Sequence, residues 1–159
     1  MPAKTHPLQK ILYGLALIVA LFTGFGNMPL YGRYYIADVP GFGWSGDFFI
    51  NVNVHILAGS LLLAIAVYAF MNSILHGEGR KQRLTFTGRL RVFFLVLSLL
   101  TGILMVIKNL PEIRFPLEML IAFNFAHMGA AVLLLIVSLL ALILQRPWKN
   151  NRYALRNRR

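Results

Sequence analysis

The sequence contains no cysteine, and this absence excludes several kinds of chemistry. Without thiols the chain cannot form disulfides, hold an iron–sulfur cluster through thiolates or attach a c-type haem covalently. Any iron–sulfur relay must therefore belong to a partner protein. The sequence also shows no Ser-His-Asp set, no phosphate-binding loop and no paired carboxylates placed for acid–base catalysis.

Charged residues are scarce as well. Only 13% of the 159 residues are charged and only 5 are acidic, whereas 58% are apolar and the mean hydropathy is +0.67. This composition is typical of an integral membrane protein. The net charge of +11 comes from short basic segments between apolar runs, and the sequence offers no basic folded domain that would bind nucleic acid. Membrane lipid is the partner that this charge favours.

Four apolar runs organise the chain, at about residues 8–25, 48–75, 92–107 and 116–144. The first lacks the short apolar core and small-residue cleavage site of a signal peptide, so we expect it to be retained as a span. The runs predict an all-α fold, an up-down bundle of four transmembrane helices that forms a single domain over residues 1–159.

The distribution of basic residues predicts the orientation. With four spans, both termini lie on one side of the membrane, and that side carries all lysines and arginines except Arg33, Lys108 and Arg114. The positive-inside rule then places both termini in the cytoplasm of a multi-pass protein of the bacterial inner membrane. The aromatic connection at 27–47 is interpreted as an interfacial belt, with a docking surface for an extrinsic partner as the alternative.

Two histidines lie inside the apolar runs. His55 and His127 belong to spans that enter from the same side, so both are expected roughly 10–17 Å below the outer surface. Ionisable residues within a membrane are costly and usually functional. We therefore predict that they are the axial ligands of one b-type haem, with Gly59 and Ala131 letting the porphyrin lie close to the backbone. The alternative is a pair of structural histidines bonded to neighbouring helices, and zinc is disfavoured because it requires four ligands.

Further polar residues are assigned to the same site. Asn53 and Asn124 are expected either to orient the imidazoles or to satisfy contacts between helices. Arg33 and Arg114 are candidates for pairing with haem propionates, and ordinary snorkelling at the interface is the alternative.

Several short motifs occur in a fixed order: Thr23-Gly24, His55 with Gly59, Gly88, Thr101-Gly102-Ile103 and His127 followed by small residues. In their order and spacing they resemble the four-helix cytochrome b subunits of membrane-bound formate dehydrogenases and, more loosely, those of nickel–iron hydrogenases. The resemblance covers nearly all of residues 8–145.

The resemblance implies two stacked haems, of which the outer one is held at the positions of His55 and His127. The ligands of the second haem would lie near Lys10 and Ala141, and neither residue can serve. His6 lies before its span and His76 lies beyond the end of its own, so both are interpreted as interfacial side chains. We therefore expect one haem b.

This resemblance also implies a role in the respiratory chain. The chain would be a non-catalytic electron-transfer subunit that anchors a larger oxidoreductase complex, including a periplasmic subunit or one with iron–sulfur clusters or c-type haem. It would link that complex to quinone or another carrier. In the family the quinone site accompanies the inner haem, so a quinone site on this chain is an open alternative. The runner-up function is a haem-free membrane anchor or assembly subunit.

Overall fold

The computed structural model describes residues 7–28, 30–75 and 84–147, and within them it is all-α. Each of its four long helices is long and apolar enough to cross a membrane, which supports the prediction of a multi-pass membrane protein. The helices are α1 (Pro7–Gly26), α2 (Phe48–Leu75), α4 (Phe86–Ile107) and α5 (Leu117–Ile143).

Three of the four predicted spans agree with a helix to within about a residue at each end, but the third begins earlier than predicted. The run was expected to start at residue 92, because Arg89 and Arg91 were assigned to the basic loop. In the structure α4 starts at Phe86, where the Thr85 hydroxyl accepts a hydrogen bond from the Gly88 amide at 3.0 Å. This N-cap satisfies a helix donor that would otherwise be unpaired, and the two arginines continue the helix.

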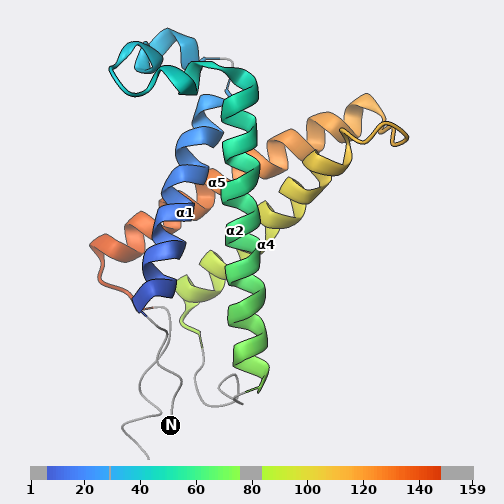
Figure 1. Cartoon of the computed structure of the whole chain (residues 1–159). Helices are drawn as coiled ribbons and strands as arrows, with labels where there is room; N and C mark the ends of the chain where they lie inside the picture. Colours follow the sequence, from blue (N-terminus) through green and yellow to red (C-terminus); the bar gives the residue numbers. More distant parts are fainter. Residues whose placement is uncertain (1–6, 29, 76–83, 148–159) are drawn as a thin grey trace, which may run out of the picture. The chain divides into compact units, whose positions relative to one another are not determined.

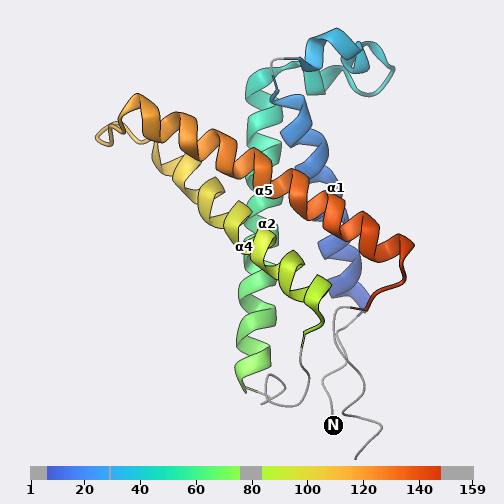
Figure 2. The ribbon, with the colours of Figure 1, turned by 180° about the vertical axis from the view of Figure 1, so that it is seen from behind.

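The chain divides into two compact units, Met1–His76 and Gly77–Arg159. In the first unit α1 packs along α2 (Figure 1), and in the second α4 packs along α5 (Figure 2). Most large apolar side chains are exposed, as expected for helices that face lipid. The buried side chains are few and mostly small, which lets the paired helices approach closely.

Both helix pairs use the same pattern of buried residues. Ala58 and Leu62 follow His55 by three and seven positions, and Ala130 and Leu134 follow His127 by the same intervals. Positions three and seven residues apart lie on one helix face, so each histidine shares the face that packs against the partner helix. The second helix of each pair is therefore built on one repeated pattern.

The connection between α1 and α2 is folded rather than extended. It consists of three short 3-10 helices: η1 (Tyr31–Tyr34), η2 (Ile36–Asp38) and η3 (Gly43–Gly46). Phe22 of α1 contacts Phe42 and Trp44 with ring centroids 5.6 and 5.9 Å apart. The aromatic residues that the sequence suggested for an interfacial belt thus include rings that pack on the end of α1.

A hydrogen bond holds this connection together. Ser45 donates to the Phe42 carbonyl at 2.6 Å, so its oxygen accepts the hydrogen bond from the Tyr31 hydroxyl at 2.7 Å. Tyr31 and Ser45 are both buried. A buried polar pair of this kind fixes the connection in one conformation on top of the helix pair.

In the second unit, hydrogen bonds connect the start of α4 with the end of α5. Gln145 adopts a left-handed backbone (φ 50°), and the Arg146 amide donates to the Ala141 carbonyl at 2.8 Å, which is the Schellman arrangement at a helix end. Thr85 donates to the Pro147 carbonyl at 2.7 Å, and Arg91 donates to the Arg146 carbonyl at 3.1 Å. The start of α4 is thereby tied to the end of α5.

Candidate functional site

His55 lies on the face of α2 that packs against α1. Its Nδ1 is 3.0 Å from the hydroxyl oxygen of Thr23, which is buried. Thr23 donates its single hydroxyl proton to the Val19 carbonyl one turn earlier, at 2.7 Å. The threonine oxygen must therefore accept from the imidazole, so His55 carries its hydrogen on Nδ1 and its lone pair on Nε2.

His127 is held in the same way in the second unit. Its Nδ1 is 3.1 Å from the Thr101 hydroxyl oxygen, and Thr101 donates its proton to the Leu97 carbonyl at 2.7 Å. The Ser98 carbonyl also lies 3.0 Å from Nδ1. Because a carbonyl can only accept, this contact gives independent support for a hydrogen on Nδ1 and a lone pair on Nε2.

A glycine follows each threonine and makes room for the imidazole. A Cβ atom added at Gly24 would lie 3.2 Å from Cε1 of His55, and one added at Gly102 would lie 3.2 Å from Cε1 of His127. Both distances are tighter than ordinary van der Waals contact. We call each set of threonine, glycine and histidine a threonine–glycine clamp; the first consists of Thr23, Gly24 and His55, and the second of Thr101, Gly102 and His127.

The clamps define what the two histidines can do chemically. Histidines that bind metals almost always donate their other ring N–H to an oxygen, which fixes the tautomer and raises the basicity of the ligating nitrogen. Nδ1 plays this part in both clamps, so Nε2 is the nitrogen that would ligate a metal. In residues 7–28, 30–75 and 84–147 there is no group of three or more histidine, cysteine or acidic side chains that could hold a metal ion. Each clamp would thus contribute one ligand.

Glycines beside the histidines leave space for a flat group. A Cβ atom added at Gly59 or at Gly129 would meet nothing within 4 Å. A porphyrin could therefore approach the backbone at these positions. By contrast, Ala58 and Ala130 are buried and belong to the helix packing. Ala131, four residues after His127, is half-buried.

Asn53 and Asn124 were expected either to orient the imidazoles or to satisfy contacts between helices. Asn53 is exposed on α2, and the Asn124 amide donates to the Leu120 carbonyl of its own helix at 2.7 Å. The orienting oxygens described above come instead from Thr23 and Thr101. Both threonines were part of motifs noted in the sequence, but spacing alone did not show that they contact the histidines.

Arg33 and Arg114 are the cations predicted as partners of the propionates. Arg114 is exposed in the segment between α4 and α5. The side chain of Arg33, together with His6 and His76, lies outside the described residues.

A buried asparagine that the sequence interpretation missed lies next to the first clamp. The Asn51 side chain is fully buried, and its Nδ2 donates to the Thr23 carbonyl at 2.9 Å and to the Asn27 side-chain oxygen at 2.8 Å. It precedes His55 by four residues, so it lies one helical turn away on the same face. The four-residue interval between Asn51 and His55 could have identified this asparagine from the sequence.

The second clamp has an apolar residue at this place. Phe123 precedes His127 by four residues, and its ring meets that of Phe115 at 5.5 Å and 85°. The repeated pattern therefore differs one turn before the histidine. The hydrogen bonds of Asn51, which connect the first clamp with Asn27 just after α1, belong to the first unit.

Comparison with family models, with curated proteins and with solved structures finds no match. The class that the structure defines is a four-helix protein with four candidate membrane spans and a clamped histidine in each helix pair.

Proposed function

We propose that the chain is a transmembrane electron-transfer subunit in which His55 and His127 ligate the iron of one haem b. The observation that carries this proposal is the repeated clamp, which gives both histidines the same tautomer by the same contacts. This is the arrangement that metal-ligating imidazoles use. The resemblance to cytochrome b subunits of formate dehydrogenases agrees with it in the positions of both ligands.

The order of the helices supports a shared iron. α2 and α5 are each the second helix of a pair, so in a four-span protein both cross the membrane in the same direction. At a rise of 1.5 Å per residue, His55 lies about 10 Å and His127 about 15 Å from the start of its helix. We infer similar depths, closer to the side opposite the termini. With both termini in the cytoplasm, this is the periplasmic side of a bacterial inner membrane.

The chain's own residues would supply the ligands and their surroundings. Haem, when bound, supplies one-electron chemistry at its iron. Because both His55 and His127 would ligate the iron, we expect neither oxygen nor substrate chemistry at the metal. The clamps orient the imidazoles, the apolar helices keep water away from the site, and Arg114 is a candidate partner for a propionate.

The remaining parts of an electron path must come from partners. The chain holds no thiolate that could bind an iron–sulfur cluster. We propose that it anchors a larger respiratory oxidoreductase complex containing a periplasmic subunit, or a subunit with iron–sulfur clusters or c-type haem, and that it passes electrons to quinone or another carrier.

The test is a reduced-minus-oxidised visible spectrum of the purified protein, with haem quantified by extraction. We expect one low-spin b-type haem per chain, and its loss in both His55→Ala and His127→Ala. Ser60→Ala, an exposed polar substitution on α2, is the matched control and should keep the full signal.

The alternative function, a haem-free anchor or assembly subunit, predicts a different result. There the same hydrogen bonds would only satisfy two intramembrane histidines. A well-folded sample produced with ample haem would then show no haem absorbance, and the histidine variants would leave the spectrum unchanged. That outcome would sink the electron-transfer proposal.

A further inference from the structure

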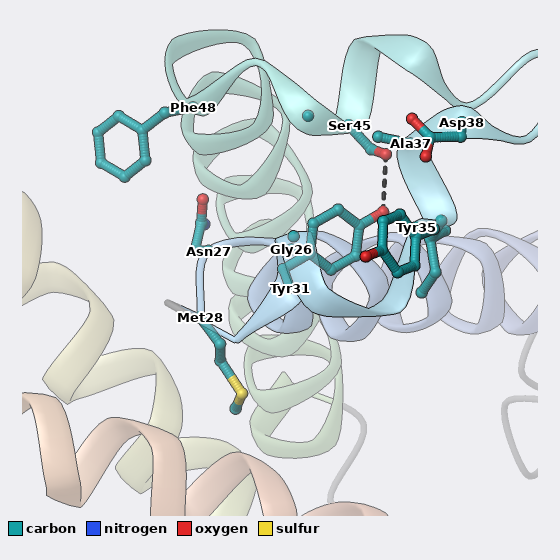
Figure 3. A pocket seen from close by; sticks show the side chains of 12 residues that line it. Gly26, Asn27, Met28, Tyr31, Tyr35, Ala37, Asp38, Ser45 and Phe48 are labelled. Carbon is teal, nitrogen blue, oxygen red and sulfur yellow. Dashed lines mark hydrogen bonds between the residues drawn. The ribbon is translucent and has the colours of Figure 1, made fainter.

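The first unit contains a pocket of about 620 Å³ between the end of α1, the folded connection and the start of α2. A volume of this size suits a small organic group. Figure 3 shows Asp38 and Tyr35 toward one end of the pocket and Asn27, Met28 and Phe48 toward the other. We propose that the pocket binds an ethanolamine phosphate group, as carried by the headgroup of a zwitterionic phospholipid. This proposal does not rest on the proposed electron transfer, because it requires no haem.

The charge of the lining favours a cation at one end of the pocket. Of the 12 residues that line it, all from the described part of the chain, none is lysine, arginine or histidine, and Asp38 is the one acid. The Asp38 side chain is exposed, so a ligand can reach its carboxylate. Asp47, the other acid of the connection, instead accepts a hydrogen bond from the Ile50 amide at 3.0 Å. An ammonium group paired with Asp38 would form a charge-assisted hydrogen bond.

The hydrogen bonds of the wall favour a ligand that donates. Ser45 donates its hydroxyl hydrogen to the Phe42 carbonyl at 2.6 Å, and Tyr31 donates its own to Ser45 at 2.7 Å. Tyr31 and Ser45 both line the pocket, and neither has a hydroxyl hydrogen left for a ligand. What their oxygens can offer is a lone pair. A primary ammonium group has three N–H donors and no acceptor, so it complements such a wall.

Tyr35 adds an aromatic ring at the end of the pocket where Asp38 lies (Figure 3). An ammonium group placed over an aromatic face is attracted by the negative face of the ring. The backbone of Tyr35 has φ 51°, in the left-handed region that an aromatic residue rarely adopts. Residues held in such conformations cluster at ligand-binding sites. The ring is 71% exposed and is therefore accessible to a ligand.

The other end of the pocket suits a phosphate followed by acyl chains. Asn27 uses its side-chain oxygen to accept from Asn51 at 2.8 Å, which leaves its NH₂ group to donate to a phosphate oxygen. Met28 and Phe48 lie at the same end and offer apolar surface (Figure 3). The pocket thus presents a carboxylate, then an amide donor, then apolar side chains. A phospholipid of this kind carries its ammonium, phosphate and acyl chains in the same order.

The position of the pocket along the helices agrees with a lipid headgroup. α1 and α2 are each long enough to cross a membrane, and the pocket lies where α1 ends and α2 begins. The ends of spanning helices lie at the membrane–water interface, which is the level of the headgroups. The pocket can therefore be filled by a lipid of the surrounding bilayer.

The test is native mass spectrometry of the full-length protein in detergent, titrated with three phospholipids that carry identical acyl chains. We expect phosphatidylethanolamine to bind most tightly. Phosphatidylglycerol keeps the phosphate but has no ammonium, so it should bind about tenfold more weakly. Phosphatidylcholine keeps the positive charge but has no N–H donor, and its affinity should lie between the other two.

Variants assign the binding to the pocket. Asp38→Asn should weaken phosphatidylethanolamine binding about tenfold and leave phosphatidylglycerol binding unchanged. Asn27→Asp keeps an acceptor for Asn51 but repels phosphate, so it should weaken the binding of all three lipids. Gly32 lines the pocket and an added Cβ would meet nothing within 4 Å, so Gly32→Leu should fill the space and abolish binding. Glu112→Gln, an exposed acid outside the lining, is the matched control and should change nothing.

Competition by soluble glycerophosphoethanolamine identifies the source of the group. Weak competition supports a lipid headgroup, because the acyl chains then contribute to binding. Competition as strong as that of the lipid supports the same site with a soluble ethanolamine phosphate as its ligand.

Three results would overturn the proposal. They are equal affinities for phosphatidylethanolamine and phosphatidylglycerol, equal losses in Asp38→Asn and Glu112→Gln, and a lower melting temperature of lipid-free Asp38→Asn, which would attribute its loss of binding to folding. None of these results depends on haem. A protein without haem that still selects phosphatidylethanolamine through Asp38 would therefore contradict the proposed function and support this site.

Discussion

At the scale of single residues, the two threonine hydroxyls determine which nitrogen of each histidine carries the lone pair. Each hydroxyl is turned by its own helix, because it donates to a carbonyl four residues earlier and can then only accept from the imidazole. The direction of the hydrogen bond between the helices therefore follows from a contact within one helix. A serine could do the same, whereas a valine of similar shape could not.

This argument predicts the effect of Thr23→Val. The variant keeps the packing volume but removes the acceptor of the His55 N–H, so haem affinity should fall about 10–100-fold. In the proposed haem site the imidazole would also become a weaker electron donor, so the midpoint potential should rise. Haem titration and redox titration of the b-type band measure the two effects. Thr23→Ser should behave like the native protein, and identical values for the Val and Ser variants would contradict the role of the hydroxyl.

The glycine of the first clamp gives a second prediction at this scale. Gly24→Ala places a Cβ 3.2 Å from His55, so the imidazole must shift and haem binding should weaken. Gly14→Ala on the same helix meets nothing within 4 Å and should stabilise α1 by up to about 1 kcal/mol, since alanine favours helix more than glycine does. Haem content and melting temperature of both variants, compared side by side, test the prediction. Weaker haem binding in both would point to a general effect of the substitution.

The contacts of the site residues were harder to predict from the sequence than their positions within the apolar runs. The intramembrane position of His55 and His127 was evident from the sequence, because ionisable residues stand out in apolar runs. The contact of His55 with Thr23 was not, because it spans 32 residues and depends on how two helices rotate against each other. Asn53 was considered, for its nearness to His55 in the sequence, either as an orienting residue or as an inter-helix contact, whereas Asn51 lies on the buried face one turn away from His55.

At the scale of secondary-structure elements, α5 ends in a conformation that its sequence does not favour. Gln145 has φ 50° at the position where glycine is usual, with the Schellman hydrogen bond intact. Gln145→Gly should therefore stabilise the protein by about 1 kcal/mol. Thermal unfolding in detergent, with haem absorbance and helicity as probes, measures the change. Gln145→Ala keeps the strain and should leave the stability near that of the native chain; an equal gain in both variants would refute the explanation.

The boundaries of the elements could be predicted where hydropathy changes sharply. This holds for α1, α2 and α5, whose ends coincide with polar or proline-containing segments. It fails for α4, because Arg89 and Arg91 look like loop residues although a capped first turn tolerates them. The three 3-10 helices between α1 and α2 also escaped prediction, since ring packing on α1 rather than local periodicity holds them.

At the scale of the whole molecule, the absence of cysteine makes the proposed orientation directly testable. Single cysteines can be introduced into an otherwise thiol-free chain. With both termini in the cytoplasm, Val39→Cys and Asn109→Cys should react with a membrane-impermeant maleimide in intact cells. Gln145→Cys should react only after the membrane is opened. All three positions are exposed in the structure, so a reversed labelling pattern would indicate the opposite orientation.

The repeated clamp has a consequence for the biogenesis of the protein. Each histidine is oriented by a threonine inside its own unit. Both proposed ligands can therefore be in place as soon as each helix pair has formed, and their side-chain freedom would be lost during folding rather than during any capture of haem. Haem insertion would then be a late step on a finished apoprotein. Cells starved of haem should accumulate a membrane-inserted chain that becomes spectrally competent when haem is supplied, without new protein synthesis.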